Sequence, residues 1–507
     1  MASLQSQPSP PAAARAPTES FLVFSDVHLG SDLNDCTQNI TRRSASIDRD
    51  LVLFLAHYRR QQPRGDRWRI VIAGDFIDFI GMTIAAPATE RGGSGEVELA
   101  TPPTDEERAH GLGNAADHAR LKLARVAVRH ADVFQELARF VADGHALTIV
   151  HGNHDIEFHW DPVKDDFRAL LEKHALAEHP DLDRDAFLGR VEFSPWFFYR
   201  PGVAYIEHGH QYDPFCSTDL VMAPMSPFDP RRITHGFSEI LLRHVVRPTL
   251  GMREHGHERM GMLDYVTFGL RLGLGGLVRL GGRFAVAVLE LFRLRRAYFS
   301  EAARLLRAEH ERRVALLSEA SRIGMDRLRA LLQLQEPPIT RSVRGILASV
   351  LLDRLALGVA ALLALSVVAI IGAYHGLALY AAVGVLAAWG LFHRHLSSQR
   401  RVDPAEQLVV KASQLARLFP AAFVVMGHTH TPVNAPAGPA TYINLGSWAE
   451  DEDGPDAVAD EDRGAPRATR THLVIHSQDA GAEASLFTWD GTSPRTYTLP
   501  GTDDPAA

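Results

Sequence analysis

Residues 21 to 30 read FLVFSDVHLG, an apolar run that is followed at once by Asp26 and His28. By composition the run is a buried β-strand, which puts Asp26 and His28 at its carboxyl end. Carboxylate and imidazole are both metal ligands. In an open α/β fold, ligands bind at the carboxyl edge of the sheet. The stretch therefore predicts an α/β protein with a metal site at this edge.

The same arrangement recurs along the chain. Apolar runs at 68–73, 146–150, 203–206 and 422–426 are predicted strands. The polar stretches that follow them are GDFID (74–78), GNHD (152–155), EHGHQ (207–211) and GHTH (427–430), and a sixth stretch is NLGS (444–447). Each stretch alone is a weak signal, because such short patterns occur by chance. Their order, with every member at a strand end, is specific.

Length and composition limit the alternatives. The 507 residues allow two or three domains and a sizeable core. The net charge of −8 argues against a nucleic-acid binder that relies on bulk electrostatics. Cys36 and Cys216 could form at most one disulfide. Residues 1–18 are rich in Ser, Pro and Ala and lack the apolar region of a signal peptide, so we expect a disordered leader and no export.

A long apolar segment between residues 355 and 392 predicts a transmembrane hairpin. Its halves, 355–373 and 376–392, each approach the roughly 20 residues that a helix needs to span a bilayer. A polar break, Tyr374-His375-Gly376, separates them. Arginines lie outside both ends (Arg341, Arg344, Arg354, Arg394, Arg400 and Arg401), so the positive-inside rule places both ends in the cytoplasm. The alternative is a buried helical hairpin in a soluble domain.

The polar stretches fall into two blocks, 19–215 and 402–500, and neither holds a complete set of candidate ligands. Residues 216–401 are therefore predicted to be a helical insertion into one domain, and 501–507 a tail. Within the insertion, the charge pattern of 299–334 predicts one long amphipathic helix that ends before Pro337-Pro338. The acidic stretch 451–462 is a predicted solvated loop.

Residues 268–296 mix Gly and Leu with six arginines, and two interpretations stay open. The arginines could face lipid phosphates while Leu and Phe enter the bilayer surface, or the segment could be a helical lid packed on the domain that the insertion interrupts. The arginines are Arg271, Arg279, Arg283, Arg293, Arg295 and Arg296.

Two further helical stretches, 47–60 and about 115–142, supply αβ alternation. Their histidines, His57, His118 and His130, are expected to be surface or packing residues.

The ordered set DxH, GDxxD, GNHD, a His after a strand, and GHTH resembles the calcineurin-like metallophosphoesterase superfamily. The resemblance covers both blocks but not the insertion. It implies two mixed β-sheets packed face to face with helices outside, a four-layer αββα sandwich. It also implies a hydrolase with two metal ions.

Carried over by motif, the resemblance implies two ligand sets that share Asp75 as a bridge. One set is Asp26, His28, Asp75 and His430, and the other is Asp75, Asn153, His208 and His428. These oxygen and imidazole donors suit Mn²⁺ best, with Fe or Zn²⁺ possible, and no thiolate is among them. Two divalent ions beside two carboxylates leave a positive surplus, which favours an anionic phosphate ester.

His154 resembles the catalytic histidine of the superfamily, expected to stabilise developing charge or protonate the leaving oxygen. Asp78 would orient it and favour its charged form. Asp155 is expected to hold its own loop and His151 to be structural. His210 is expected to support the ligands, although contact with substrate stays open.

Within the superfamily, SDVHLG and HGHQYD look most like the UDP-2,3-diacylglucosamine hydrolase branch, which cleaves a pyrophosphate on a lipid precursor. His154 stands where that branch has Arg, and its lid is shorter and has no spanning hairpin, so its substrate is not carried over. Protein phosphatases follow GDxxD with Arg-Gly, whereas Phe79-Ile80 follows here, which disfavours that class.

The sequence thus predicts a membrane-anchored, cytoplasm-facing metallophosphoesterase that acts on a phosphate ester or pyrophosphate, on a lipid-linked substrate by preference. Nucleic acid is an unlikely partner on charge. The alternatives are a nuclease or cyclic-nucleotide phosphodiesterase on the same scaffold, and a non-catalytic membrane scaffold or sensor.

Overall fold

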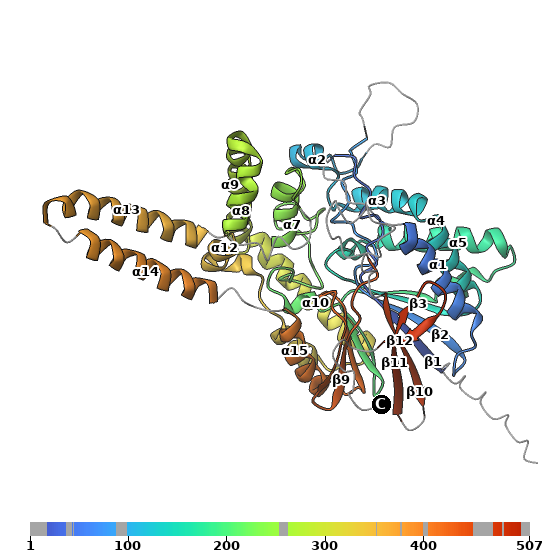
Figure 1. Ribbon diagram of the computed structural model, residues 1–507. Coiled ribbons are helices and arrows are strands. Elements are labelled where there is room, and N and C mark those ends of the chain that lie inside the picture. Colours follow the sequence, from blue (N-terminus) through green and yellow to red (C-terminus); the bar gives the residue numbers. More distant parts are fainter. Residues whose placement is uncertain are drawn as a thin grey trace, which may run out of the picture.

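The structure is a computed structural model that describes residues 18–36, 43, 45–87, 99–252, 262–350, 352–375, 378–398, 404–449, 470–478 and 481–497. It is a mixed α/β protein with two mixed β-sheets (Figure 1). The predicted leader (apart from Thr18), the acidic loop 451–462, Arg400, Arg401 and the tail 501–507 lie outside the described residues.

The larger sheet has seven strands in the order β12-β11-β10-β1-β2-β3-β4. Strands β1 to β4 are parallel, and β10 to β12 continue the sheet antiparallel from β1. The bounds are β1 (Glu19–Phe24), β2 (Arg67–Ala73), β3 (Ala146–Val150), β4 (Val191–Ser194), β10 (Thr471–Gln478), β11 (Gly481–Trp489) and β12 (Pro494–Thr496).

The smaller sheet has five strands in the order β5-β6-β7-β9-β8. Strands β6, β7 and β9 are parallel to one another, and β5 and β8 are antiparallel edges. The bounds are β5 (Phe197–Arg200), β6 (Ala204–Glu207), β7 (Phe423–Met426), β8 (Val433–Ala437) and β9 (Ala440–Asn444). Each sheet therefore joins strands from both sides of the insertion, and each predicted apolar run is confirmed as a strand.

Successive side chains along each strand point to opposite faces of its sheet, so the core is divided into a part between the two sheets and a part under the helices on each outer face. Phe21 and Val23 of β1 face Ile206 and Val425 of the smaller sheet in one apolar cluster. The other face of the larger sheet packs under α1 (Ala45–Arg60), α3 (Ala116–Arg129), α4 (Ala131–Ala142) and α5 (Asp161–Glu178). The other face of the smaller sheet packs under α10 (Glu301–Ser321), α11 (Met325–Leu334) and α15 (Pro404–Leu418). The short helices α2 (Asp105–His110) and α6 (Arg184–Leu188) lie between these elements in the chain.

The predicted helix at 47–60 is confirmed as α1, but the stretch 115–142 is two helices that meet at His130. His130 is buried and bonds through Nδ1 to Asp48 at 2.5 Å, while its Nε2 accepts the Gly30 N–H at 3.0 Å. His118 is buried as well and contacts the Thr101 carbonyl oxygen at 2.8 Å. Both histidines are packing residues, as expected.

The prediction of one continuous helix over 299–334 is wrong. Helix α10 ends where Arg322 adopts a left-handed conformation with φ of 58°, and α11 begins after Gly324. The Ser318 hydroxyl donates to the Ile323 carbonyl oxygen at 2.7 Å and fixes this turn. The break lets α10 and α11 both pack on the smaller sheet.

Residues 268–296 belong to two helices, α8 (Met262–Arg271) and α9 (Gly273–Ala297). One face of α9 buries Leu280, Ala287 and Leu291 against α7 (Phe237–Leu241), the π-helical turn η3 (Leu242–Val246) and α12 (Val343–Ser349). On its other face Leu274 and Val278 are 79% and 74% exposed. The helix thus packs on the body on one side and presents an apolar surface on the other.

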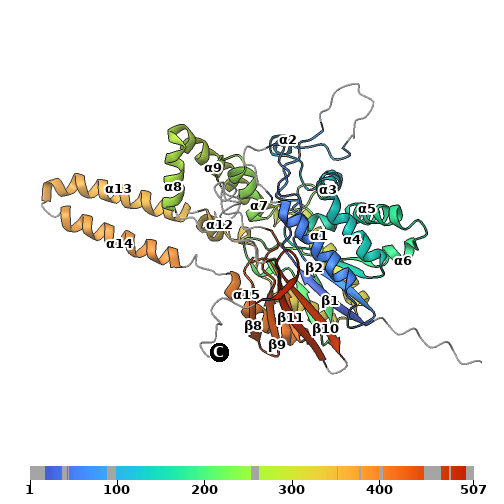
Figure 2. The same ribbon diagram turned by 45° about the vertical axis from the view of Figure 1, so that its right-hand side comes forward.

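Helices α13 (Leu352–His375) and α14 (Ala378–Ser398) run side by side and project away from the rest of the molecule (Figures 1 and 2). Of the predicted break, Tyr374 and His375 still belong to α13, whereas Gly376 lies outside the described residues. Among the described residues, one helix, over Leu352–Ile371, is long and apolar enough to cross a membrane by length and composition. Only 6% of that stretch is buried. A buried hairpin in a soluble core would not show this exposure.

Candidate metal centre

Asp75, in the loop after β2, lies among side chains from three other loops. His208 Nε2 is 3.0 Å and His28 Nε2 is 3.9 Å from Asp75 Oδ2. The other carboxylate oxygen, Oδ1, accepts the backbone N–H of His154 at 2.9 Å. Asp75 is therefore central to the cluster, in the place expected for a bridging carboxylate.

Asp26, which follows β1, meets the last of the histidine motifs. His430 Nε2 lies 3.2 Å from Asp26 Oδ1, and the rings of His28 and His430 are 5.5 Å apart. Two groups have ligand atoms within 4.8 Å of one another, namely Asp26 with His28 and His430, and Asp26 with Asp75 and His208. Residues from both blocks thus form one cluster.

The remaining two predicted ligands lie beside His208. Its Nε2 is 3.1 Å from Asn153 Oδ1, and its ring is 5.3 Å from that of His428. The other ring nitrogen, His208 Nδ1, donates to the Ala73 carbonyl oxygen at 2.9 Å, which orients the ring. All seven predicted ligands are thereby gathered in one place.

Five of these seven residues have a left-handed backbone conformation, with positive φ, which residues other than glycine rarely adopt. The φ angles are 56° at Asp26, 50° at His28, 53° at Asp75, 71° at His428 and 56° at His430. Among the described non-glycine residues only Arg322 and Arg470 share this feature. Such strain costs of order 1–3 kcal/mol per residue and concentrates at functional sites. Its concentration on these five residues indicates that their loops are shaped for the site.

Two motif glycines let the loops approach one another this closely. A Cβ atom on Gly152 would lie 2.0 Å from Asp75 Oδ1, and one on Gly427 would lie 2.4 Å from Asp26 Oδ2. Neither contact is possible for a side chain. Glycine at these positions therefore follows from the position of the two carboxylates.

The sixth stretch, NLGS, holds the loops in place without pointing a ligand into the cluster. Asn444 Nδ2 donates to the Gly427 carbonyl oxygen at 2.7 Å, and the Ser447 hydroxyl donates to the Asp26 carbonyl oxygen at 3.2 Å. The backbone N–H groups of Trp448 and Ala449 donate to the same oxygen. These bonds connect the Asp26 loop to the GHTH loop.

His154 and Asp78 form a pair beside the cluster. His154 Nδ1 lies 2.7 Å from Asp78 Oδ1, which also accepts the Gly81 N–H at 2.7 Å. Burial disfavours a charged imidazole, but the carboxylates of Asp78 and Asp75 outweigh it and raise the pKa of His154 to about 10. The side chain is 19% exposed, so the imidazolium can reach a molecule in solvent.

The same charges act on the cluster itself. Burial opposes ionisation of Asp75, yet the nearby imidazoles of His208 and His154 hold its pKa well below the usual range. Burial and the positive His154 lower the pKa of His28 to about 4. The proposed ligand His208 is affected in the opposite sense, because Asp75 raises its pKa to about 9 despite burial, and a metal ion binds it only after that proton leaves.

The three neighbouring residues have the expected structural surroundings. Asp155 accepts the backbone N–H groups of Phe76 at 2.8 Å and Gly152 at 2.6 Å, so it holds its own loop. His151 is buried and packs against Phe158. His210 is buried with its ring 5.4 Å from His208, and burial holds its pKa well below the usual value.

The sequence analysis missed Asp213 and Cys216. Asp213 Oδ2 lies 3.1 Å from His428 Nε2, and the two residues form a third group of close ligand atoms with the Cys216 sulfur. Cys216 thus lies close to the proposed ligand His428, although no cysteine is in the predicted ligand set. The aspartate of HGHQYD was visible in the sequence as a possible ligand or ligand partner. It was missed because it follows a short 3₁₀ turn, η2 (His210–Tyr212), whereas the other motif residues were recognised by their place after a strand.

The residues fit a pair of divalent ions. Two buried carboxylates, four imidazoles and one amide oxygen converge, and these are ligands that Mn²⁺, Fe and Zn²⁺ accept. The side chains of His430 and His154 are 27% and 19% exposed, whereas those of Asp26, Asp75 and His208 are at most 2% exposed. The open side of the cluster therefore lies at His430 and His154.

Comparison with protein-family models finds no match for this chain, and comparison with curated proteins finds none either.

Proposed function

We propose that this protein is a membrane-anchored phosphoesterase that depends on two metal ions and hydrolyses a phosphate ester or pyrophosphate. The observation that carries the proposal is the convergence of seven ligand-type side chains from loops spread over more than four hundred residues, five of them strained, beside His154, which is paired with Asp78. A structural role does not require this combination. It also supports membership of the calcineurin-like metallophosphoesterase superfamily.

Asp26, His28, Asp75 and His430 would hold one ion, and Asp75, Asn153, His208 and His428 the other. The pair would supply an activated water and a positive charge for the phosphoryl oxygens. Asp213 would orient His428 through the contact with its Nε2. The donor set supports Mn²⁺ most, with Fe or Zn²⁺ as further candidates.

His154 is the proposed catalytic residue of the chain. Asp78 occupies its Nδ1, which leaves Nε2 to donate to a phosphoryl or leaving-group oxygen. The Asp78 carboxylate raises the pKa of His154 and so favours the protonated form that a proton donor needs. Asp78 is a positioning residue, since it fixes the tautomer and the charge of His154 without reaching the open side.

The packing of the two sheets supports the four-layer αββα sandwich. One apolar cluster lies between the sheets, and a further cluster joins each sheet to its own helices. These three clusters support the order helix, sheet, sheet, helix. Ligands at the shared edge of the parallel strands fit this arrangement.

The helical hairpin and α9 support a membrane location, and the arginines that flank the hairpin support a phosphoesterase domain that faces the cytoplasm. The outward side chains of α13 and α14 are apolar, as a lipid surface requires, and α9 carries the exposed Leu274, Val278 and Leu289. A membrane anchor favours a lipid-linked phosphate or pyrophosphate as the substrate. The net charge of −8 disfavours the nuclease alternative.

The test is hydrolysis by the purified full-length protein, with metal analysis of the same sample. The panel is a chromogenic phosphomonoester, a phosphodiester, a cyclic nucleotide, DNA and a UDP-linked lipid, each with Mn²⁺ and with EDTA. His154→Asn should lower kcat by about 10²–10⁴-fold at unchanged metal content. His57→Asn, a half-buried histidine on α1, is the matched control and should keep full activity.

The outcomes separate the alternatives. Turnover of DNA or the cyclic nucleotide alone would support the nuclease or cyclic-nucleotide phosphodiesterase. A protein that binds two ions and turns over nothing on the panel would contradict the enzyme proposal and favour a membrane scaffold or sensor.

A further inference from the structure

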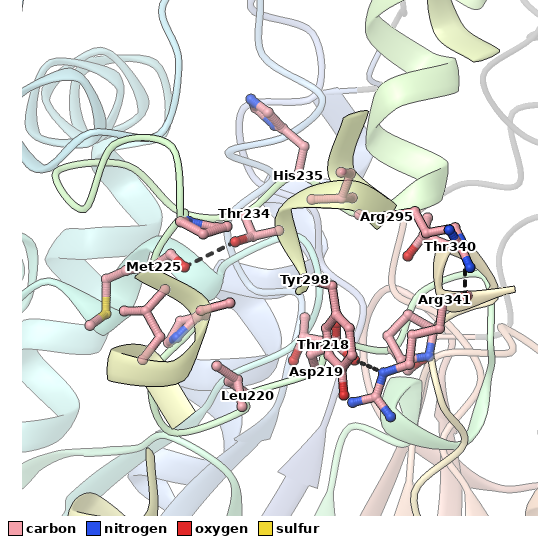
Figure 3. Close-up of a pocket in the computed structure, with 18 of the residues that line it drawn as sticks. Thr218, Asp219, Leu220, Met225, Thr234, His235, Arg295, Tyr298, Thr340 and Arg341 are labelled. Carbon is pink, nitrogen blue, oxygen red and sulfur yellow. Dashed lines mark hydrogen bonds and ion pairs between the residues drawn. The ribbon is translucent and has the colours of Figure 1, made fainter. Parts of the chain in front are cut away.

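A pocket lies in the insertion, apart from the metal centre. It is formed by three segments, 217–237, 294–307 and 338–341, and is open to solvent. None of the proposed metal ligands lines it. Figure 3 shows Thr218, Asp219, Tyr298 and Arg341 gathered on one side and Met225, Thr234 and His235 on the other.

Most of the wall is apolar. The side chains that make it so include Leu220, Met225, Phe237, Leu294 and Leu306. They come from the loop that follows the EHGHQ stretch (207–211), from α7, from the end of α9 and from α10. A pocket with such walls receives the apolar part of a small molecule.

One end of the pocket carries an excess of positive charge. Arg341 forms an ion pair with Asp219, which is the only acidic residue of the lining. The guanidinium carbons of Arg307 and Arg341 lie 5.1 Å and 4.7 Å from the centre of the Tyr298 ring. Both guanidinium groups thus pack against the Tyr298 ring.

Two arginines of this pocket hydrogen-bond to carbonyl oxygens, and Asp219, already paired with Arg341, is the one carboxylate of the lining whose charge also acts on Arg307. Arg295 donates through Nε to the Arg341 carbonyl oxygen at 3.2 Å, and Arg307 donates to the Tyr298 carbonyl oxygen at 3.1 Å. In the part of the chain that the structure describes, neither forms an ion pair with a carboxylate. Partly buried guanidinium groups without an ion pair favour a bound anion, because arginine pairs with phosphate or carboxylate through two hydrogen bonds.

We propose that this pocket binds an amphipathic anion, with a phosphate- or carboxylate-type group at Arg295 and Arg307 and an apolar chain along Leu306, Leu220 and the opposite wall. The excess charge accounts for the head group and the apolar walls account for the chain. The inference does not depend on the proposed phosphoesterase activity, because the site contains no metal ligand.

The pocket is connected to the metal centre through the backbone. The Glu336 N–H donates to the Gln211 carbonyl oxygen at 2.9 Å, and the Ile339 N–H donates to the Pro214 carbonyl oxygen at 2.9 Å. These bonds fix the segment that carries Arg341 to the loop that carries Asp213. A ligand in the pocket therefore contacts the element that orients His428.

The test uses the full-length protein in phosphatidylcholine nanodiscs, with a dodecylphosphonate that carries a diazirine at the end of its chain. The phosphonate is used because its carbon–phosphorus bond is not a phosphoester. After irradiation in EDTA, so that the metal centre cannot hold the probe, labelled peptides are mapped by mass spectrometry. We expect labels within 217–237 and 294–307, competed by unlabelled dodecylphosphonate and not by dodecanol.

Matched variants identify the groups that bind. Arg307→Gln should lower labelling about tenfold, whereas Arg304→Gln, an exposed arginine of the same helix, should leave it unchanged. Leu306→Trp should block the pocket, whereas Leu305→Trp places the same ring on the exposed face. Melting curves of the four variants check their folding.

Two results would overturn the proposal: labelling confined to the hairpin helices, or labelling that Arg307→Gln and Leu306→Trp leave unchanged in folded protein. Competition by soluble hexylphosphonate would identify a soluble ligand as the source of the anion. Competition by lysophosphatidate supplied in the bilayer would identify a lipid. Either competitor supports the site.

Discussion

Gly152→Ala is the sharpest test of the close approach between the GNHD loop and Asp75. The added methyl group would lie 2.0 Å from Asp75 Oδ1 and 2.6 Å from the Asp75 backbone nitrogen. An ordinary contact needs about 3.4 Å, so one of the two loops must move by about 1 Å or more. The backbone nitrogen cannot rotate away, and the strained Asp75 has little freedom to adjust.

A displacement of this size should act on the metal centre more than on the fold. Overpacking of this kind costs about 1–3 kcal/mol of stability. A shift of about 1 Å at a reacting group lowers activity by about 10²-fold. We therefore expect Gly152→Ala to remain folded, to bind Mn²⁺ more weakly and to lose about two orders of magnitude in kcat/KM.

The assay is titration calorimetry with Mn²⁺, together with melting curves and turnover of the best substrate of the panel. Gly324→Ala is the control, because this glycine has an ordinary φ of −57° and no atom within 4 Å of an added Cβ. The reasoning would be refuted by a folded Gly152→Ala protein with the Mn²⁺ affinity of the wild type. Loss of turnover with unchanged affinity would show that Asp75 does not bridge the ions.

Three further predictions concern other parts of the molecule. Asp213→Asn should weaken Mn²⁺ binding by about tenfold in calorimetry at unchanged melting temperature, and an unchanged affinity would remove Asp213 from the centre. Leu363→Lys with Val367→Lys, each costing about 2.5–3.5 kcal/mol in a bilayer, should release the protein from carbonate-washed membranes, whereas Leu316→Lys on α10 should not. Burial opposes ionisation of Glu107, but its bonds to an arginine and to the Thr104 N–H lower its pKa to about 2. Because this folded-state pKa is below the unfolded value, the ionised Glu107 stabilises the fold fully above about pH 5, and this stabilisation disappears as the pH falls toward 2. Glu107→Gln should therefore lower the free energy of unfolding by about 1–2 kcal/mol at pH 7. Urea unfolding of the variant should also depend less on pH between about 2 and 5 than that of the wild type.

The strands and the ligand cluster could be predicted because both depend on local signals. An apolar run followed by a carboxylate or imidazole places that side chain at a strand end wherever the run is parallel and buried. Asp26 and Asp75 come together for this reason, since β1 and β2 are parallel neighbours. The glycines of GNHD and GHTH lie against Asp75 and Asp26, which are distant from them in the chain.

The features that were missed depend on tertiary contacts. Asp213 reaches His428 across more than two hundred residues and follows no strand, so its pattern resembles that of any loop aspartate. The break between α10 and α11 lies at Arg322, which no propensity marks as a helix end. The pocket in the insertion joins three segments whose arginines look like surface charges in the sequence.

The division of both sheets between the two blocks has a consequence for how the protein is made. Strand β1 needs β10 as a neighbour and β6 needs β7, yet the hairpin is translated before either partner exists. On the proposed topology, the ribosome delivers α13 and α14 to the bilayer while the first half of the enzyme still has open sheet edges. Assembly of the domain is then completed beside the membrane, after the anchor is already in place.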